Sequence, residues 1–153
     1  MKKITPFLWF DTQAEEAMNF YASVFKNSKV LGVSRGPDGR AQSVNFELEG
    51  QELIAFNAGP EFKFNEAISF FVDCKTQEEV DDLWNKLTAD GGEESQCGWL
   101  KDKYGLSWQI VPSALGQLMG DPDPVKAQRV VQAMLKMHKI DIAGLQRAYE
   151  QEA

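Results

Sequence analysis

Histidine and cysteine are scarce in this chain, which has one histidine, His138, and two cysteines, Cys74 and Cys97. Zinc, nickel and iron sites usually take about three or more nitrogen, sulfur or charged oxygen ligands from the protein, and one histidine falls short of that. The two cysteines do not form a CxxC pair and are typical of buried thiols in a reducing compartment. We therefore expect no metal, no cofactor and no structural disulfide.

Basic residues and long apolar runs are also lacking. Sixteen lysines and arginines stand against 23 aspartates and glutamates, a net charge of −7, so the positive surface that nucleic acids and anionic membranes require is missing. No apolar run approaches the ~20 residues of a membrane-spanning helix, and residues 1–4 lead into the chain without a signal-peptide core. We expect a cytoplasmic protein with no nucleic-acid partner and no membrane partner.

A faint internal repeat organises residues 4–112 of this chain, whose 153 residues fit one globular domain. The first copy opens with an aromatic run at 4–10, which is typical of a strand. A capping-box pattern follows at 12–15 and predicts a helix start. Turn signals at 36–39 and 50–51 then separate three further strands. The first half therefore reads as β-α-β-β-β.

The second copy repeats this order, with a strand at 67–72 and another capping box at 76–79. Four positions on each predicted helix superpose at a constant offset of 63 residues. These positions are Ala17, Phe20, Tyr21 and Val24 in the first helix, and Val80, Leu83, Trp84 and Leu87 in the second. One helix covers only one face of a small sheet, so the uncovered face is where we expect function.

The tail carries helix signals of its own. Asp123-Pro124 is a good helix start, and Asp141 is placed to cap a final helix. We predict an α+β fold with two βαβββ modules forming a curved mixed sheet, followed by C-terminal helices. The predicted ranges are 1–112 for the paired modules, about 4–58 and 66–112, and 113–153 for a helical extension in the same domain or a dimer interface.

With these segments in place, the chain resembles the vicinal oxygen chelate superfamily, which includes glyoxalase I, the bleomycin-resistance and fosfomycin-resistance proteins and the extradiol dioxygenases. It is most similar to the PhnB-like branch, often labelled "3-demethylubiquinone-9 3-methyltransferase-like". The strings that carry the resemblance lie at 6–10, 14–17 with Phe20-Tyr21, 71–73, 104–112 and 137–142. The resemblance implies two modules in a half-open curved sheet, a homodimer, and an apolar cavity on the concave side.

Metal-dependent members of this superfamily hold a divalent ion with histidine and glutamate side chains from both modules. Counting from the shared landmarks, the corresponding positions here are Pro6 and Ala67 for histidine, and Ala55 and Gln109 for carboxylate. Only the Gln109 amide has a ligand atom, and one neutral oxygen does not make a site. The resemblance therefore implies the fold without its metal.

The methyltransferase label meets a similar difficulty. Enzymes that use S-adenosylmethionine usually place a glycine-rich turn between a strand and a helix, and the turns at 11–12 and 73–76 contain no glycine. We treat the label as a family name.

Strand alternation predicts the lining of the cavity once Gln109 is taken to face it. Ser69, Phe71, Asn57, Leu8 and Phe10 then face the same way, while Trp9, Phe70, Phe56 and Trp108 face the helices. Trp99 adds a stacking surface. Aromatic rings with a few amides and hydroxyls suit a small, partly apolar molecule. The alternative is that these residues fill a closed core.

Three functions fit these observations. The first is metal-free binding of a small ligand. The second is an enzyme of the glyoxalase, dioxygenase or methyltransferase-like type, which needs a general base that the expected strands do not offer. The third is a dimeric structural or regulatory module without a ligand. The first is our leading hypothesis.

Overall fold

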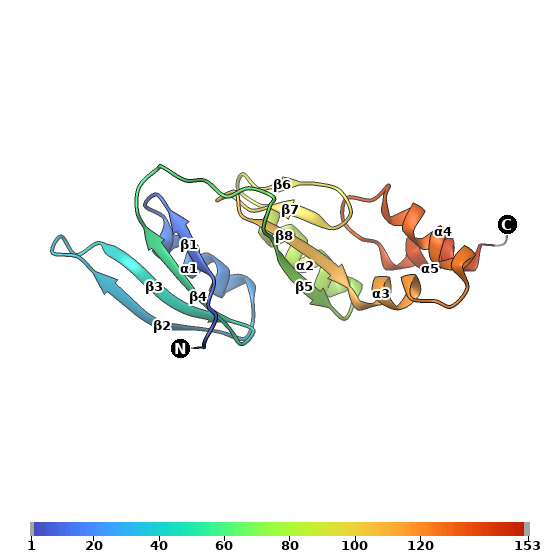
Figure 1. Cartoon of the computed structure of the whole chain (residues 1–153), viewed down its shortest axis with the longest axis horizontal. Helices are drawn as coiled ribbons and strands as arrows, with labels where there is room; N and C mark the ends of the chain where they lie inside the picture. Colours follow the sequence, from blue (N-terminus) through green and yellow to red (C-terminus); the bar gives the residue numbers. More distant parts are fainter. Residues whose placement is uncertain (1, 152–153) are drawn as a thin grey trace. The chain divides into compact units, whose positions relative to one another are not determined.

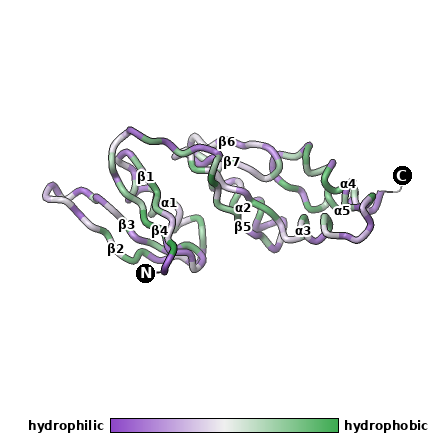
Figure 2. Tube along the Cα trace, in the orientation of Figure 1, coloured by the Kyte–Doolittle hydropathy of each residue, from purple (hydrophilic) through white to green (hydrophobic). Residues whose placement is uncertain are grey.

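The computed structural model describes residues 2–151 and divides the chain into two compact units, with the division between Phe64 and Asn65. Each unit contains a four-stranded sheet among its described residues (Figure 1). No helix within residues 2–151 is long and apolar enough to span a membrane. Figure 2 shows instead short hydrophobic stretches spread over both units.

The first unit confirms the predicted βαβββ order. Its elements are β1 (Phe7–Phe10), α1 (Ala14–Val24), β2 (Ser28–Arg35), β3 (Ala41–Leu48) and β4 (Gln51–Asn57). The strands lie in the order β1-β4-β3-β2, with β1 parallel to β4 and the other pairs antiparallel. The helix α1 packs on this sheet with its apolar stripe, where the Tyr21 ring stacks on Phe46 at 6.5 Å between centroids.

The start of α1 differs from the prediction. The helix begins at Ala14 with Gln13 in the cap position, and no side chain of its own caps it, so the expected capping box at 12–15 does not form. Asn57 at the end of β4 takes over this role, because its Oδ1 accepts a hydrogen bond from the Ala14 N–H at 2.9 Å. A neighbouring strand therefore satisfies a helix donor that a local pattern was expected to satisfy.

The second unit repeats the module and adds the tail. Its elements are β5 (Phe70–Cys74), α2 (Gln77–Thr88), β6 (Glu93–Glu94), β7 (Trp99–Lys101), β8 (Ser107–Pro112), α3 (Ser113–Met119), α4 (Pro124–Met134) and α5 (Ile142–Glu150). The strands lie in the order β5-β8-β7-β6, with β5 parallel to β8. The cap predicted at the start of α2 is confirmed, since Thr76 Oγ1 accepts from the Glu79 N–H at 3.1 Å. The α+β class and the two βαβββ modules followed by C-terminal helices are therefore as predicted.

The C-terminal helices pack on the second unit of their own chain. Their core is a cluster of Val111, Leu115, Val130, Ile140 and Leu145. The Gln77 side chain at the start of α2 ties the tail down, because it donates to Ile140 O and accepts from the Ile142 N–H. Asp123 caps α4 as predicted, accepting from the Val125 N–H. Asp141 precedes α5 without a side-chain hydrogen bond to its first turn.

Candidate functional site

The open face of the second sheet brings four predicted site residues together. Phe71, Gln109 and Trp99 are register partners across β5, β8 and β7, so their side chains stand in one row on the same face. Gln109 Nε2 donates to Ser69 Oγ at 3.0 Å, which places Ser69 beside this row. The Phe71 side chain is 61% exposed, and those of Gln109 and Trp99 are half-buried. We call these four residues the second open face.

The opposite face of this sheet is covered by α2, as predicted for Trp108 and Phe70. Their rings meet edge to face at 5.2 Å between centroids. Trp108 is buried, and its indole Nε1 donates to Asp102 Oδ2 at 2.9 Å. The sheet therefore has a closed apolar side and an accessible side that mixes aromatic and polar groups.

Leu8, Phe10 and Asn57 do not belong to an open face, which corrects the predicted lining. Leu8 and Phe10 are buried on the side of the first sheet that α1 covers, in register with Ala55 and Asn57 of β4. The Asn57 amide is used on that same side, where it caps α1 and donates to Ala41 O. Leu8 and Phe10 therefore belong to the core of the first unit, and the half-buried Asn57 amide lies on the same side.

The predicted lining is one residue out of register along β1 and β4. The helices repeat at an offset of 63 residues, and the same offset applied to the strands equates Leu8 with Phe71. In the structure Trp9 pairs with Phe56 and Phe71 pairs with Gln109, both on open faces, so β1 and β5 repeat at an offset of 62 residues. A slip of one residue moves every side chain of a strand to the other face.

The open face of the first sheet is an aromatic cluster that contains Trp9 and Phe56, which the sequence analysis assigned to the helix side. Trp9 lies edge to face with Phe62 at 4.9 Å and with Phe56 at 6.4 Å, and Phe7 contacts Phe56 at 5.6 Å between centroids. The indole Nε1 of Trp9 donates to Gly59 O at 2.9 Å. The segment after β4 folds back onto Trp9, so residues of the same unit cover its ring and accept its indole hydrogen bond. The alternation of side chains along β1 predicts that Phe7 and Trp9 share this face once the correct register is chosen.

The positions expected for metal ligands offer no suitable donor set. Ala55 is fully buried on the α1 side, so its neighbours Ile54 and Phe56 face the open side instead, and both are apolar. Gln109 is the one member of the predicted set with a ligand atom on an open face. Within residues 2–151 no group of three or more histidine, cysteine, aspartate or glutamate side chains is close enough to hold a metal ion.

Ser107 and Lys101 form a second row beside Gln109 that the sequence reasoning did not identify. Ser107 and Lys101 are register partners of each other. Ser107 lies two residues before Gln109 on β8, and Lys101 lies two residues after Trp99 on β7. The Ser107 hydroxyl is fully buried and has no hydrogen-bond partner among the described residues. Lys101 forms an ion pair with Glu66, and this hydrogen bond raises the pKa of the Lys101 ammonium. This end of the second sheet is therefore polar.

The two cysteines differ in environment, which predicts their reactivity. Burial raises the pKa of the Cys74 thiol to about 12, whereas Cys97 is half-exposed. Because the thiolate is the nucleophile, at pH 8 iodoacetamide should alkylate Cys97 and leave Cys74 unmodified in the folded protein. Peptide mass spectrometry after timed alkylation measures this, with urea-unfolded protein as the control in which both react. Equal labelling of both thiols in the folded chain would contradict the burial of Cys74.

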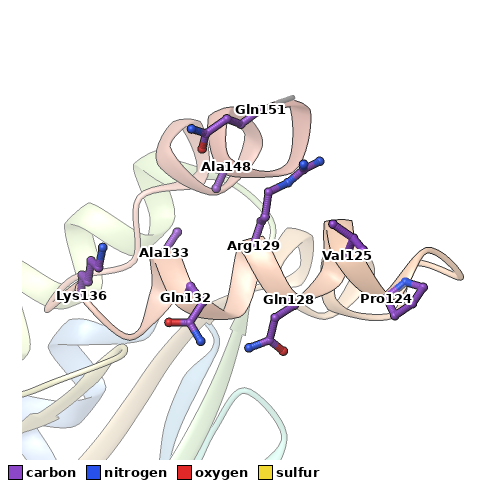
Figure 3. Close-up of a pocket in the computed structure, with 9 residues that line it drawn as sticks. All are labelled: Pro124, Val125, Gln128, Arg129, Gln132, Ala133, Lys136, Ala148 and Gln151. Carbon is purple, nitrogen blue, oxygen red and sulfur yellow. The ribbon is translucent and has the colours of Figure 1, made fainter. Parts of the chain in front are cut away.

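A groove of about 650 Å³ between α4 and α5 lies outside every predicted site (Figure 3). It is lined by Pro124, Val125, Gln128, Arg129, Gln132, Ala133, Lys136, Ala148 and Gln151. Arg129 Nη2 donates to Tyr149 O near the end of α5 at 3.0 Å, which is a favourable place for a cation. The arginine therefore has a structural role in joining the two helices.

Comparison with known proteins identifies relatives of this fold. The family model described as 3-demethylubiquinone-9 3-methyltransferase matches residues 2–111 and so ends before α3. The PhnB protein from Bacillus cereus is 37% identical, with a match over 73% of this chain and 100% of that chain and a TM-score of 0.69. None of the curated proteins compared with the chain gives a significant match.

Two more distant structures share the fold. Protein PA1353 from Pseudomonas aeruginosa is 16% identical over 73% of this chain and 98% of its own, with a TM-score of 0.60. The fosfomycin resistance protein FosX from Listeria monocytogenes, solved with Mn(II) and sulfate, is 15% identical over 71% of this chain and 90% of its own, with a TM-score of 0.54. The chain belongs to the PhnB-like 3-demethylubiquinone-9 3-methyltransferase family.

Proposed function

We propose that the second open face binds a small, partly apolar molecule without a resident metal ion. The row Phe71, Gln109, Trp99 carries this proposal, because it sets one hydrogen-bonding amide between an exposed aromatic ring and a half-buried one. Ligand pockets typically combine apolar walls with a few placed polar groups. The hydrogen bond from Gln109 Nε2 to Ser69 Oγ restricts the amide and so supports a defined orientation of a bound molecule.

The donor set argues against a metal in this role. FosX shares the fold and was solved with Mn(II), yet the open faces here present aromatic, aliphatic, hydroxyl and amide side chains at the strand positions where that superfamily places its ligands. Divalent manganese and zinc favour charged oxygen or imidazole ligands. The residues present do not fit such an ion, so our proposal includes no metal-assisted step.

The carboxylates near this face within residues 2–151 do not suit a general base. Asp73 lies two residues after Phe71 on β5, Glu66 forms an ion pair with Lys101, and Glu93 is the register partner of Lys101. Hydrogen bonds from Lys101 and Lys75 lower the pKa of Glu66 and Asp73 respectively, which moves both away from the near-neutral value of an effective general base. Glu93 is exposed on the edge strand β6, two strands from β8. The strand-to-helix turns at 11–12 and 73–76 also lack the glycines that usually bind S-adenosylmethionine, so they do not support the methyltransferase activity named by the family model. Binding is therefore the better-supported function.

A fluorescent neutral probe tests the proposal. We expect N-phenyl-1-naphthylamine to bind the full chain saturably in buffer containing EDTA, and Phe71→Ala to weaken binding about tenfold, because a stacking surface is lost. Val125→Ala removes a similarly exposed apolar side chain from α4 and should leave the dissociation constant unchanged. Probe fluorescence measures both. No saturable binding, or binding only after Mn²⁺ or Zn²⁺ is added, would contradict the proposal.

Pairing of two copies, which the family resemblance implies, is a separate proposal. It concerns assembly, and the binding face described above lies within one unit of one chain. Sedimentation velocity at several concentrations distinguishes a homodimer from a monomer.

A further inference from the structure

The two open faces differ in whether their aromatic rings are already paired. In the first unit Trp9 is covered by Phe62 at 4.9 Å, and its indole nitrogen is hydrogen bonded. In the second unit neither Phe71 nor Trp99 contacts another aromatic ring among residues 2–151, although Phe71 is 61% exposed. The exposed Phe71 ring and the part of the Trp99 ring that is exposed are therefore not stacked on another aromatic ring of the described chain.

The spacing of this pair sets the thickness of what fits between the rings. Phe71 and Trp99 are separated by one strand, so their Cβ atoms are about two inter-strand spacings apart, roughly 9.6 Å. Aromatic rings interact with centroids roughly 4.5–7 Å apart, and two such contacts in series span roughly 9–14 Å. One planar ring satisfies both contacts, whereas a saturated ring is thicker and has no π-face.

The Gln109 amide is placed to recognise one edge of such a ring. Gln109 lies on the strand between the two aromatic residues, so its amide faces the edge of any ring placed between them. An amide both donates and accepts, and its bond to Ser69 Oγ at 3.0 Å limits its rotation. The complementary ligand edge therefore carries a donor and an acceptor side by side.

We propose that Phe71 and Trp99 clamp a single planar conjugated ring system whose edge, bearing an adjacent hydrogen-bond donor and acceptor, pairs with the Gln109 amide. This rests on the proposed function, since it names the ligand class of the same face. It excludes saturated or strongly puckered molecules, which the broader proposal admits.

Three lactams form a matched set of probes for the full chain. Quinolin-2(1H)-one is planar with adjacent N–H and C=O groups, its fully saturated analogue keeps the lactam but is puckered, and 1-methylquinolin-2-one is planar without the donor. Isothermal titration calorimetry should show the planar N–H lactam binding about tenfold more tightly than either of the others, since stacking and one buried hydrogen bond each contribute that much.

Substitutions separate the two parts of the clamp. Phe71→Leu and Trp99→Leu keep apolar bulk without a flat face, so each should reduce the preference for planar over saturated lactam to about twofold, whereas Phe71→Tyr should keep it. Gln109→Leu should abolish the preference for the N–H lactam over its methylated form and leave the planar preference intact. Circular dichroism of each variant confirms that it is folded.

The outcomes distinguish this inference from the proposed function. Tight binding of the naphthylamine probe with equal affinity for planar and saturated lactams would overturn the clamp and leave the broader binding proposal standing. A planar preference that survives both leucine variants would also overturn the clamp, because it would locate the ring elsewhere. Absence of saturable binding by any of these probes would overturn both proposals.

Discussion

Replacing Asp102 with alanine should destabilise the chain by about 3–5 kcal/mol and lower the melting temperature by about 10 °C. Asp102 is 2% exposed, and its carboxylate accepts hydrogen bonds from the Tyr104 and Leu106 N–H groups and from the Trp108 indole. Alanine leaves these donors without their charged acceptor, and at least two of them are buried. Urea denaturation followed by circular dichroism measures the loss.

Asp38 offers a matched control for this prediction. It forms a similar turn between β2 and β3, where its Oδ1 accepts from the Arg40 N–H at 3.0 Å, but it is exposed. Asp38→Ala should cost less than about 1 kcal/mol, because water replaces the lost acceptor. Asp102→Asn should fall between the two alanine variants, since it keeps one oxygen acceptor. A loss for Asp102→Ala as small as that for Asp38→Ala would show that the buried carboxylate does not organise the β7–β8 hairpin.

Truncating Leu145 to alanine should cost about 3 kcal/mol and release the tail from the second unit. Leu145 of α5 is fully buried in the cluster with Val111 of β8 and Val130 of α4. The substitution leaves a cavity and removes apolar contacts that join β8, α4 and α5. Limited trypsin digestion should then cut within residues 120–151 faster than in the wild type.

Leu135 provides the same substitution without the burial. It lies at the end of α4 with its side chain 51% exposed. Leu135→Ala should change stability by less than about 0.5 kcal/mol and leave the digestion pattern unchanged. If both alanine variants behave alike, the tail is not held by its apolar core.

The order of elements could be predicted from the sequence because helices and turns are encoded locally. The apolar stripe of α2, including Leu83 and Trp84, and the cap at Thr76 depend on residues three or four positions apart, and the structure contains all of them. The cap of α1 could not be predicted this way. Its acceptor is Asn57, which is 43 positions from Ala14 and reaches it only after β1 and β4 have paired.

The candidate site could be predicted in the second unit and not in the first. One correctly oriented residue, Gln109, fixes the face of Phe71 and Trp99 through strand pairing, and the structure places them in one row. In the first unit no residue of known orientation fixes the strand register. An error of one residue there places Leu8, instead of Trp9, on the open face. The alternation of apolar and polar residues along one strand does not determine how β1 pairs with β4.

Nuclear magnetic resonance of the ¹⁵N-labelled full chain, titrated with the neutral naphthylamine probe in EDTA, tests metal-free binding on the second open face most directly. We expect saturable shifts of the Trp99 indole N–H and the Gln109 side-chain amide, and none for the indoles of Trp84 and Trp108, which are hydrogen bonded to Glu94 and Asp102. Unchanged Trp99 and Gln109 signals at saturating probe, or shifts that require an added divalent ion, would contradict it.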